Sequence, residues 1–341
     1  MSHQLIRIAT INNPKLTHTN TMKTTNTTLL LILCFTLAAC SQASGQTLIS
    51  ATGTAVVTTA PTVAPTIGIT PTPVVTPTPR AFSGARAYED VQYQASLGPR
   101  TPGSEAHDQV ISWILDELRL ANWNAEIQEL QNGQTIKNII ARRGDTGPLI
   151  ILGAHFDSRF IADQDPDPNL RSQAVIGSND GASGVAVLLE LARTLPDNLP
   201  FRLWLVFFDA EDNGGIEGWD WIMGSRAFVT SLQEKPDAAV IIDMIGDANL
   251  NIPIEQNSNP ALVEEIWQVA KNLGYENIFL NQPGYSMIDD HTPFLEAGIP
   301  AIDIIDFDYP YWHTSQDTPD KVSAASLEII GKTLSAWLST R

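Results

Sequence analysis

Residues 148–157 read PLIILGAHFD, an uncharged run of seven residues that leads directly into a histidine and, two positions later, an aspartate. A short, continuous apolar run is typical of a strand that is buried on both faces, as the strands of parallel sheets are. Three further runs have the same character, at residues 203–208, 238–242 and 299–305. The four runs together predict the strands of a largely parallel central sheet.

Apolar residues at helical spacing predict helices between and around these strands. The helices are expected at residues 104–118, with Ser104 as the N-cap, and at 184–195, 261–273 and 324–338, and two more strands at 125–130 and 135–142. Buried strands that alternate with helices indicate an α/β domain. We expect a three-layer sandwich with a central, mostly parallel twisted sheet flanked by helices.

The chain divides into three expected parts: a signal peptide at residues 1–40, a Thr/Pro-rich disordered linker at 41–85, and one folded domain at 86–341. The apolar run at residues 29–39 is too short to cross a bilayer as a helix. It is typical of the core of a signal peptide, with Lys23 as its basic flank, and Met22 is the expected true start. The repeated Thr-Pro pairs of the linker favour an extended tether.

The signal segment ends in LAAC at residues 37–40, which resembles a bacterial lipobox. That resemblance implies cleavage before Cys40 and lipidation of its sulfur, and an ordinary signal peptide with a chance cysteine is the alternative. We therefore expect an exported lipoprotein, cell-surface or periplasmic, that contacts a membrane only through its anchor at Cys40. The other cysteine, Cys34, also lies in this segment, so the folded domain has no disulfide.

The folded part of the chain is strongly acidic. Residues 81–341 carry all 38 Asp and Glu against 16 Lys and Arg, a net charge of −22. Binding of nucleic acid, or of an anionic membrane surface, needs a basic face. The charge therefore excludes a nucleic-acid partner and is consistent with solubility.

Carboxylates and histidines come directly after the apolar runs, where each strand should end. His155 and Asp157 follow the first run, Asp209, Glu211 and Asp212 follow the second, Asp243 follows the third, His313 lies in the loop after the fourth, and Asp180 precedes a helix. Because the carboxyl ends of parallel strands meet at one edge, we expect these residues to converge there. Acids gathered in this way would repel one another unless a cation lay between them. Two histidines with at least three carboxylates suit Zn²⁺.

Several neighbouring residues allow two interpretations. Asp157 either orients the ring of His155 or caps the loop, and the aromatic residues Trp219, Trp221 and Trp312 either pack structurally or form a small apolar slot. His107, on a polar helical face, is expected at the surface. His291 stands beside an acidic motif.

A run of alternating acids forms a possible calcium loop. Asp163, Asp165, Asp167 and Asn169 have the spacing that opens such a loop, but Pro166 and Pro168 intervene and the glycine and the final glutamate of the pattern are missing. A solvated loop on the substrate side is the alternative.

The acidic and histidine motifs resemble those of the M28 zinc peptidases over residues 90–341. The resemblance rests on His155-x-Asp157, Ser178-Asn-Asp180-Gly-Ala-Ser-Gly184, Asp209-Ala-Glu211-Asp212, Asp243 and Trp312-His313-Thr314. Within that family the chain is most similar to the glutaminyl-peptide cyclotransferase branch, through Gly224-Ser225-Arg226, Asp289-Asp290-His291 and Trp312-His313-Thr314. The resemblance implies a zinc aminopeptidase-like fold and peptide or protein N-termini as substrates.

The resemblance also implies roles for individual residues. One zinc would be held by Asp180, Asp212 and His313, and in the aminopeptidase members a second would be held by His155 and Asp243, with Asp180 bridging. Glu211 would be the general base and acid, with Asp243 and Asp289 in a hydrogen-bonded network beside it, and Trp312 would line the substrate pocket. The family usually has Glu-Glu where this chain has Glu211-Asp212, and the shorter Asp212 is still a competent zinc ligand.

The expected activity is that of a zinc-dependent glutaminyl-peptide cyclotransferase, which converts N-terminal Gln to pyroglutamate with release of ammonia. An M28 zinc aminopeptidase that hydrolyses N-terminal residues is the alternative, since His155 and Asp243 are both present. A third hypothesis is a non-catalytic, tethered binding module on the same fold, which the retained ligands and Glu211 disfavour.

Overall fold

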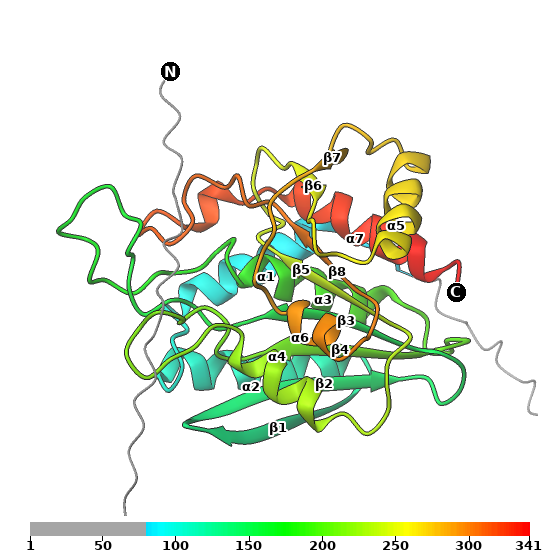
Figure 1. Ribbon diagram of the computed structural model, residues 1–341, viewed down its shortest axis with the longest axis horizontal. Coiled ribbons are helices and arrows are strands. Elements are labelled where there is room, and N and C mark those ends of the chain that lie inside the picture. The colour runs from blue at the N-terminus through cyan, green and yellow to red at the C-terminus, as the bar shows by residue number, and fades with distance from the viewer. Residues whose placement is uncertain (1–79) are drawn as a thin grey trace, which may run out of the picture. The chain divides into compact units, whose positions relative to one another are not determined.

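The computed structural model describes residues 80–341, which are drawn in colour in Figure 1. The expected signal peptide at 1–40, the lipidation site Cys40 and residues 41–79 of the expected linker lie outside the described residues.

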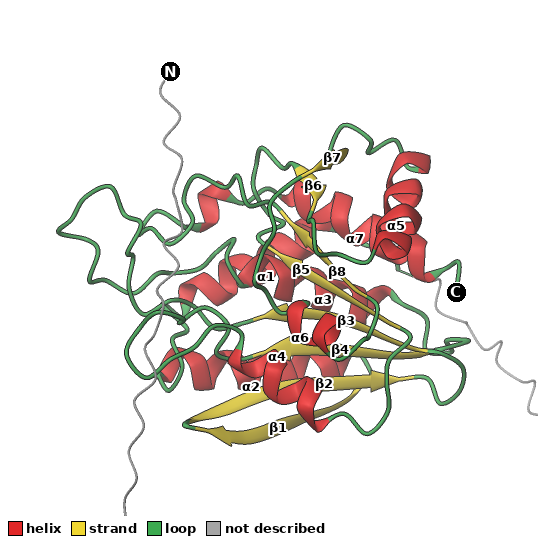
Figure 2. Ribbon diagram, viewed as in Figure 1, coloured by secondary structure: helices red, strands yellow, loops and turns green. Residues whose placement is uncertain are grey.

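A six-stranded sheet forms the centre of the domain (Figure 2). Its strands, in order across the sheet, are β1 (Asn124–Asn132), β2 (Gln134–Arg143), β4 (Arg202–Phe208), β3 (Leu149–His155), β5 (Ala238–Asp243) and β8 (Ala301–Ile305). The pairs β4–β3, β3–β5 and β5–β8 are parallel, whereas β1–β2 and β2–β4 are antiparallel. The prediction of a mostly parallel central sheet is confirmed.

Helices cover both faces of the sheet and complete the three layers (Figure 1). One face packs against α1 (Gly84–Ser96), α2 (Glu105–Leu120), α3 (Ala182–Thr194), α5 (Pro260–Asn272) and α7 (Ala324–Leu338), and the other against α4 (Met223–Ser231) and α6 (Thr292–Glu296). A small parallel pair, β6 (Ile252–Ile254) and β7 (Phe279–Pro283), packs against α5, and a 3-10 helix (Pro319–Lys321) precedes α7.

Capping and burial explain why these segments fold as they do. The side chain of Ser104 accepts a hydrogen bond from the backbone N–H of His107 at 3.1 Å, so Ser104 caps α2 as predicted. Asn259 caps α5, and Pro260 occupies its first turn, where its missing N–H costs nothing. Every residue of β3 and of β5 is buried, which agrees with their continuous apolar sequences.

Helix α1 has no clear apolar stripe in the sequence, because its buried face consists mainly of small and polar residues. Those residues are Gly84, Ala87, Asp90, Val91 and Gln94. The helix begins two residues before residue 86, where the sequence places the start of the folded domain. The short elements α4, α6, β6 and β7 are likewise absent from the sequence-based prediction.

The chain enters the domain near the amino end of β4. Arg80, Ala81 and Phe82 line a cavity together with Phe201, which directly precedes β4, and Leu338 near the end of α7. Phe82 is buried, and its ring lies over Gly331 so closely that a Cβ there would overlap it. The contact ties the start of the folded chain to its last helix.

We expect Gly331→Ala to lower the free energy of unfolding by about 1–3 kcal/mol, because overpacking against the buried ring outweighs the gain in helix propensity. In a Phe82→Ala background the same change has no ring to displace and should be neutral or stabilising. Urea unfolding of the four proteins measures the coupling. Equal effects of Gly331→Ala in both backgrounds would contradict the contact.

Candidate metal centre

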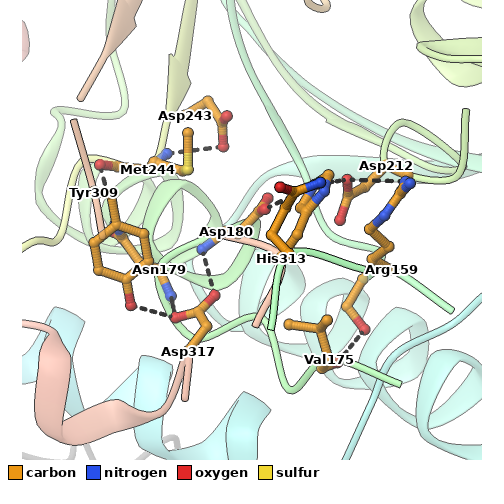
Figure 3. Close-up of polar contacts among 12 residues, drawn as sticks. Arg159, Val175, Asn179, Asp180, Asp212, Asp243, Met244, Tyr309, His313 and Asp317 are labelled. Atoms are coloured by element: carbon orange, nitrogen blue, oxygen red, sulfur yellow. Dashed lines mark hydrogen bonds and ion pairs between the residues drawn. The ribbon is translucent and has the colours of Figure 1, made fainter. Parts of the chain in front are cut away.

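The strands bring the acids and histidines of the sequence motifs to one edge of the sheet. His155 is the last residue of β3 and Asp243 the last of β5, while Glu211 and Asp212 lie in the turn that follows β4. Asp180 comes from the loop before α3 and His313 from the loop after β8. These six side chains are all buried. Figure 3 shows Asp180, Asp212 and His313 pointing toward one another.

Two groups of potential metal ligands share Asp180. In the first, Nε2 of His313 lies 2.8 Å from Oδ1 of Asp212 and 3.7 Å from Oδ2 of Asp180. In the second, Nε2 of His155 lies 3.1 Å from Oδ1 of Asp180 and 3.2 Å from Oδ1 of Asp243. Each oxygen of Asp180 therefore faces one histidine, as a bridging carboxylate requires.

The donor atoms of both groups fit a zinc ion. Oδ2 of Asp180 is buried and has no hydrogen-bond partner among the described residues. Burial and the negative charge of Asp180 raise the pKa of Asp212 to about 6. Burial, with the charges of Asp289 and Asp180, raises the pKa of Asp243 to about 7 despite its contact with His155. A cation bound between these groups would relieve the repulsion, and imidazole with carboxylate donors suits zinc.

A buried aspartate that the sequence motifs did not single out holds the loop of Asp180. Asp317 accepts hydrogen bonds from the backbone N–H groups of Asn179 at 2.8 Å and Asp180 at 3.1 Å, and from the Tyr309 hydroxyl at 2.7 Å (Figure 3). Because Asp317 lies four residues after His313, it ties the two ligand-bearing loops together. The signal in the sequence that could have identified Asp317 is its position in the loop that carries His313.

Asp157 holds the turn that carries Glu211, the expected general base. It accepts hydrogen bonds from the backbone N–H groups of Glu211 at 3.0 Å and Asp212 at 3.3 Å, and from the Asn213 side chain at 3.1 Å. Its Oδ1 also lies 3.5 Å from Nδ1 of His155. The structure thus favours the loop-holding interpretation of Asp157, with contact to the ring as a second feature.

His313 is held by residues on both sides of its ring. The ring stacks on Trp312, with centroids 3.8 Å apart, and on Trp221 at 6.1 Å. Its Nδ1 lies 3.4 Å from Oδ1 of Asp163, which accepts a hydrogen bond from Nε of Arg159 at 2.6 Å. Arg159 also donates to the backbone carbonyl of Asp212 at 2.7 Å, so it braces two ligands at once.

The alternating acids at residues 163–169 are engaged in hydrogen bonds rather than arranged around a shared point. Asp165 accepts bonds from the backbone and the hydroxyl of Ser315 and from the Asp167 N–H, and Asp167 accepts from Asn169. Among the described residues these acids form no metal-ligand group. The structure gives the calcium interpretation no support, and it turns Asp163 toward His313 instead.

Glu211 lines a cavity of about 300 Å³ at this edge of the sheet. Burial raises the pKa of Glu211 well above its ordinary value, and the charges of Asp289 and Asp212 raise it further, against the effect of His155. Asp289 lines the same cavity, and burial also raises its pKa. Glu211 and the two expected network acids, Asp243 and Asp289, therefore meet at one cavity.

Apolar and aromatic side chains form about half of the walls of this cavity, alongside the acids and His313. They include Trp221, Trp312, Phe307, Ile305 and Met287. Trp219, which was expected with them, does not line the cavity and packs on Phe160, with ring centroids 5.3 Å apart. The structure thus brings Trp221 and Trp312 to the site and leaves Trp219 outside it.

The prediction that His107 lies at the surface is wrong. Its side chain is buried, and Nε2 lies 2.7 Å from Oδ1 of Asp209, the first residue after β4. Oδ2 of Asp209 accepts a hydrogen bond from the backbone N–H of Lys137. The polar side of α2 therefore faces inward at His107, where it contacts the residue that follows β4, two positions before Glu211.

Backbone strain accompanies the site. Ala210, Met244 and His313 have φ angles of 55°, 46° and 52°, in the left-handed region that residues with a side chain avoid. Ala210 directly precedes Glu211, Met244 directly follows Asp243, and His313 is itself a ligand candidate. Strained residues of this kind cluster at functional sites.

The model of peptidase family M28 matches residues 138–338, which is more than half of the 341-residue chain. The chain belongs to peptidase family M28. Glutaminyl-peptide cyclotransferase of Boiga irregularis is 27% identical to this M28 chain over 287 residues, which cover 70% of this chain and 76% of that protein.

Two solved M28-like structures show the same fold. Glutaminyl cyclase of Porphyromonas gingivalis is 32% identical, with a TM-score of 0.72, and the match covers 76% of this chain and 98% of that one. A Zn-dependent exopeptidase from Parabacteroides distasonis is 29% identical, with a TM-score of 0.72 and coverage of 77% and 100%. The predicted family, fold class and enzymatic nature are confirmed, and zinc is the metal that the relatives and the donor atoms indicate.

Within residues 80–341, the helices are too short or too polar for any of them to cross a bilayer.

We expect Asp163→Asn to weaken zinc binding about 10–100-fold, because the ring of His313 loses the carboxylate that supports it. Competition with a chromogenic chelator measures the affinity. Asp167→Asn is the matched control, since Asp167 lies in the same loop and, within the described residues, its carboxylate accepts hydrogen bonds from Asn169 alone. Equal affinities in the two variants would refute the role of Asp163.

Removal of zinc should lower the melting temperature by about 5–10 °C, since the bound ion stabilises the folded state and the ligand carboxylates stay buried together without it. Differential scanning calorimetry with and without a strong chelator tests this. Zinc, and not magnesium, should restore the original value. The Asp180→Asn variant, which loses a ligand from both groups, should show a smaller shift than the wild-type protein.

Proposed function

We propose that this chain is a glutaminyl-peptide cyclotransferase that acts on peptides or proteins with an N-terminal Gln. The carrying observation is the 300 Å³ cavity, in which Glu211 and Asp289 meet aromatic walls beside the candidate metal ligands. A space of this size accepts one side chain with its α-amine rather than an extended peptide. The resemblance to glutaminyl cyclases from several organisms supports the same activity.

The reaction forms one new C–N bond and releases one molecule of ammonia. The α-amine nitrogen attacks the γ-carbonyl carbon of the Gln side chain, the bond to the side-chain nitrogen breaks, and ammonia leaves. A zinc ion held by Asp180, Asp212 and His313 would supply Lewis-acid polarisation of that carbonyl.

Glu211 is the group that moves the proton in this proposal. Its raised pKa, which burial causes, suits a group that takes a proton from the α-amine and returns it to the leaving nitrogen. Asp243 and Asp289 line the same cavity and would position the substrate amine next to Glu211. Trp221 and Trp312 would enclose the Gln side chain and exclude water, so that the amine rather than water attacks.

A single zinc at Asp180, Asp212 and His313 is sufficient for this reaction. The second group, His155 with Asp180 and Asp243, supports the alternative of a two-zinc aminopeptidase. The likeness to a Zn-dependent exopeptidase favours the same alternative.

Residues 1–85 bear on where the enzyme works. We propose that residues 1–40, with Met22 as the start, direct export, that Cys40 carries a lipid, and that residues 41–85 tether the folded domain. The LAAC sequence at 37–40 and the Thr/Pro-rich composition support this arrangement. The protein would then act at the cell surface or in the periplasm on peptide N-termini.

Incubation of the zinc-loaded protein with a peptide that begins Gln-Leu tests the activity, with the products followed by mass spectrometry. Loss of one ammonia without loss of residues is the expected result. Stepwise loss of whole residues would instead establish an aminopeptidase. No reaction on this or other peptides would favour a binding module.

Glu211→Gln should reduce kcat by about 10²–10⁴-fold, because the proton carrier is lost, while the zinc content stays unchanged. Glu217→Gln is the control, since Glu217 lies in the same loop outside the cavity lining. Initial rates together with metal analysis distinguish the two effects. Activity of Glu211→Gln close to that of the control would remove Glu211 from the mechanism.

A further inference from the structure

A second buried cluster of ionisable side chains lies next to the catalytic cavity. It comprises Glu255 after β6, Asp289 and His291 at the start of α6, and Asp303 in the middle of β8. His291 and Asp303 are completely buried, and neither lines the catalytic cavity. The reaction proposed above uses only Asp289 of these four.

This cluster lacks the partners that buried polar groups normally have. Nδ1 of His291 and both carboxylate oxygens of Asp303 are without a hydrogen-bond partner among residues 80–341. Within the same range, no lysine or arginine pairs with Glu255, Asp289 or Asp303. Leaving such groups unpaired in the interior costs several kcal/mol, so the cluster is incomplete as protein atoms alone.

The geometry identifies what is missing. Asp289, His291 and Asp303 each offer one ligand atom, and these atoms all lie within 4.8 Å of one another. Nδ1 of His291 lies 3.8 Å from Oδ2 of Asp303, which is too far for a hydrogen bond but leaves room for an ion between them.

Glu255 fixes the orientation of the histidine from its other side. Its Oε2 lies 3.2 Å from Nε2 of His291. Glu255 is itself held by the Ser258 hydroxyl at 2.8 Å and by the backbone N–H of Met287 at 2.9 Å. A carboxylate beside Nε2 favours the tautomer with its proton at Nε2, which leaves Nδ1, the nitrogen nearer Asp303, as the one that can bind a metal. Metal-binding histidines are typically arranged in this way.

We propose that Asp289, His291 and Asp303 bind a divalent transition-metal ion, with Zn²⁺ as the best fit, and that Glu255 orients His291 for it. One imidazole with two carboxylates favours such an ion over Ca²⁺ or Mg²⁺, which take oxygen ligands alone. The site shares no ligand with the two groups that contain Asp180. Because His291 and Asp303 are closed off from solvent, the ion is structural, and it fixes Asp289 where that side chain meets the catalytic cavity.

Metal counting in the Asp180→Asn variant of the full protein isolates this site from the catalytic ligands. Asp180 belongs to both of the other groups, so its loss leaves two protein ligands in each, and dialysis against a weak chelator removes zinc from such remnants. We expect one zinc per chain to remain, as measured by inductively coupled plasma and native mass spectrometry. Absence of zinc from a folded Asp180→Asn protein overturns the proposal.

Addition of Asp303→Asn to Asp180→Asn should remove that last zinc. The matched control adds His107→Gln instead, which alters an equally buried histidine beside an aspartate elsewhere, and it should keep the zinc. Zinc that persists after Asp303→Asn refutes the site. The zinc count does not depend on which reaction the enzyme catalyses, so it is independent of the proposed function.

Anomalous diffraction at the zinc edge gives a second readout that needs no variant, in case Asp303→Asn does not fold. Crystals of the zinc-loaded wild-type protein should show a peak in contact with Nδ1 of His291 and the Asp303 carboxylate. Density for a water molecule there, without an anomalous signal, overturns the proposal.

Discussion

The burial of like charges at one edge of a parallel sheet is the constraint on which the rest of this structure depends. Asp180, Asp212 and Asp243 are held together in the interior, where they face two histidines and, at 4.0 Å from Asp212, the guanidinium of Arg159. The carboxylates repel one another, so the site is stable only if other parts of the molecule hold them in place or a cation compensates them. The structure provides for both: the candidate ligand atoms converge as a bound cation requires, and hydrogen bonds cross-link the loops that carry them.

Several of these cross-links use neutral backbone N–H groups as donors. Asp157 and Asp317 accept backbone N–H groups from the ligand-bearing turns and thereby fix Asp212 and Asp180 without contributing a positive side chain. Two arginines contribute as well: Arg159 donates to the backbone of Asp212 and pairs with Asp163, and the buried Arg100 donates to the backbone carbonyls of Phe156, Ile176 and Gly177. The geometry of the site therefore depends on residues outside the two groups of candidate ligands.

Features that depend on local pattern could be predicted from the sequence, whereas features that depend on tertiary packing could not. Continuous apolar runs located β3, β4, β5 and β8, and the acids behind them identified the edge where the site lies. Helix α1 was missed because it buries small and polar residues, and His107 was misplaced because a polar helical face turned inward toward Asp209. Arg159, Asp163 and Asp317 could not be assigned, since their partners are brought to them only by the loops of the folded chain.

The chain enters the folded domain at the end of the sheet opposite the candidate metal ligands. Phe82 is anchored beside the amino end of β4, whereas His155, Asp212 and Asp243 lie at the carboxyl ends of the strands. Anything attached through the segment that precedes residue 80 therefore joins the domain on the side away from the catalytic edge. The side of the sheet that carries the candidate metal ligands is therefore left free of the entering chain.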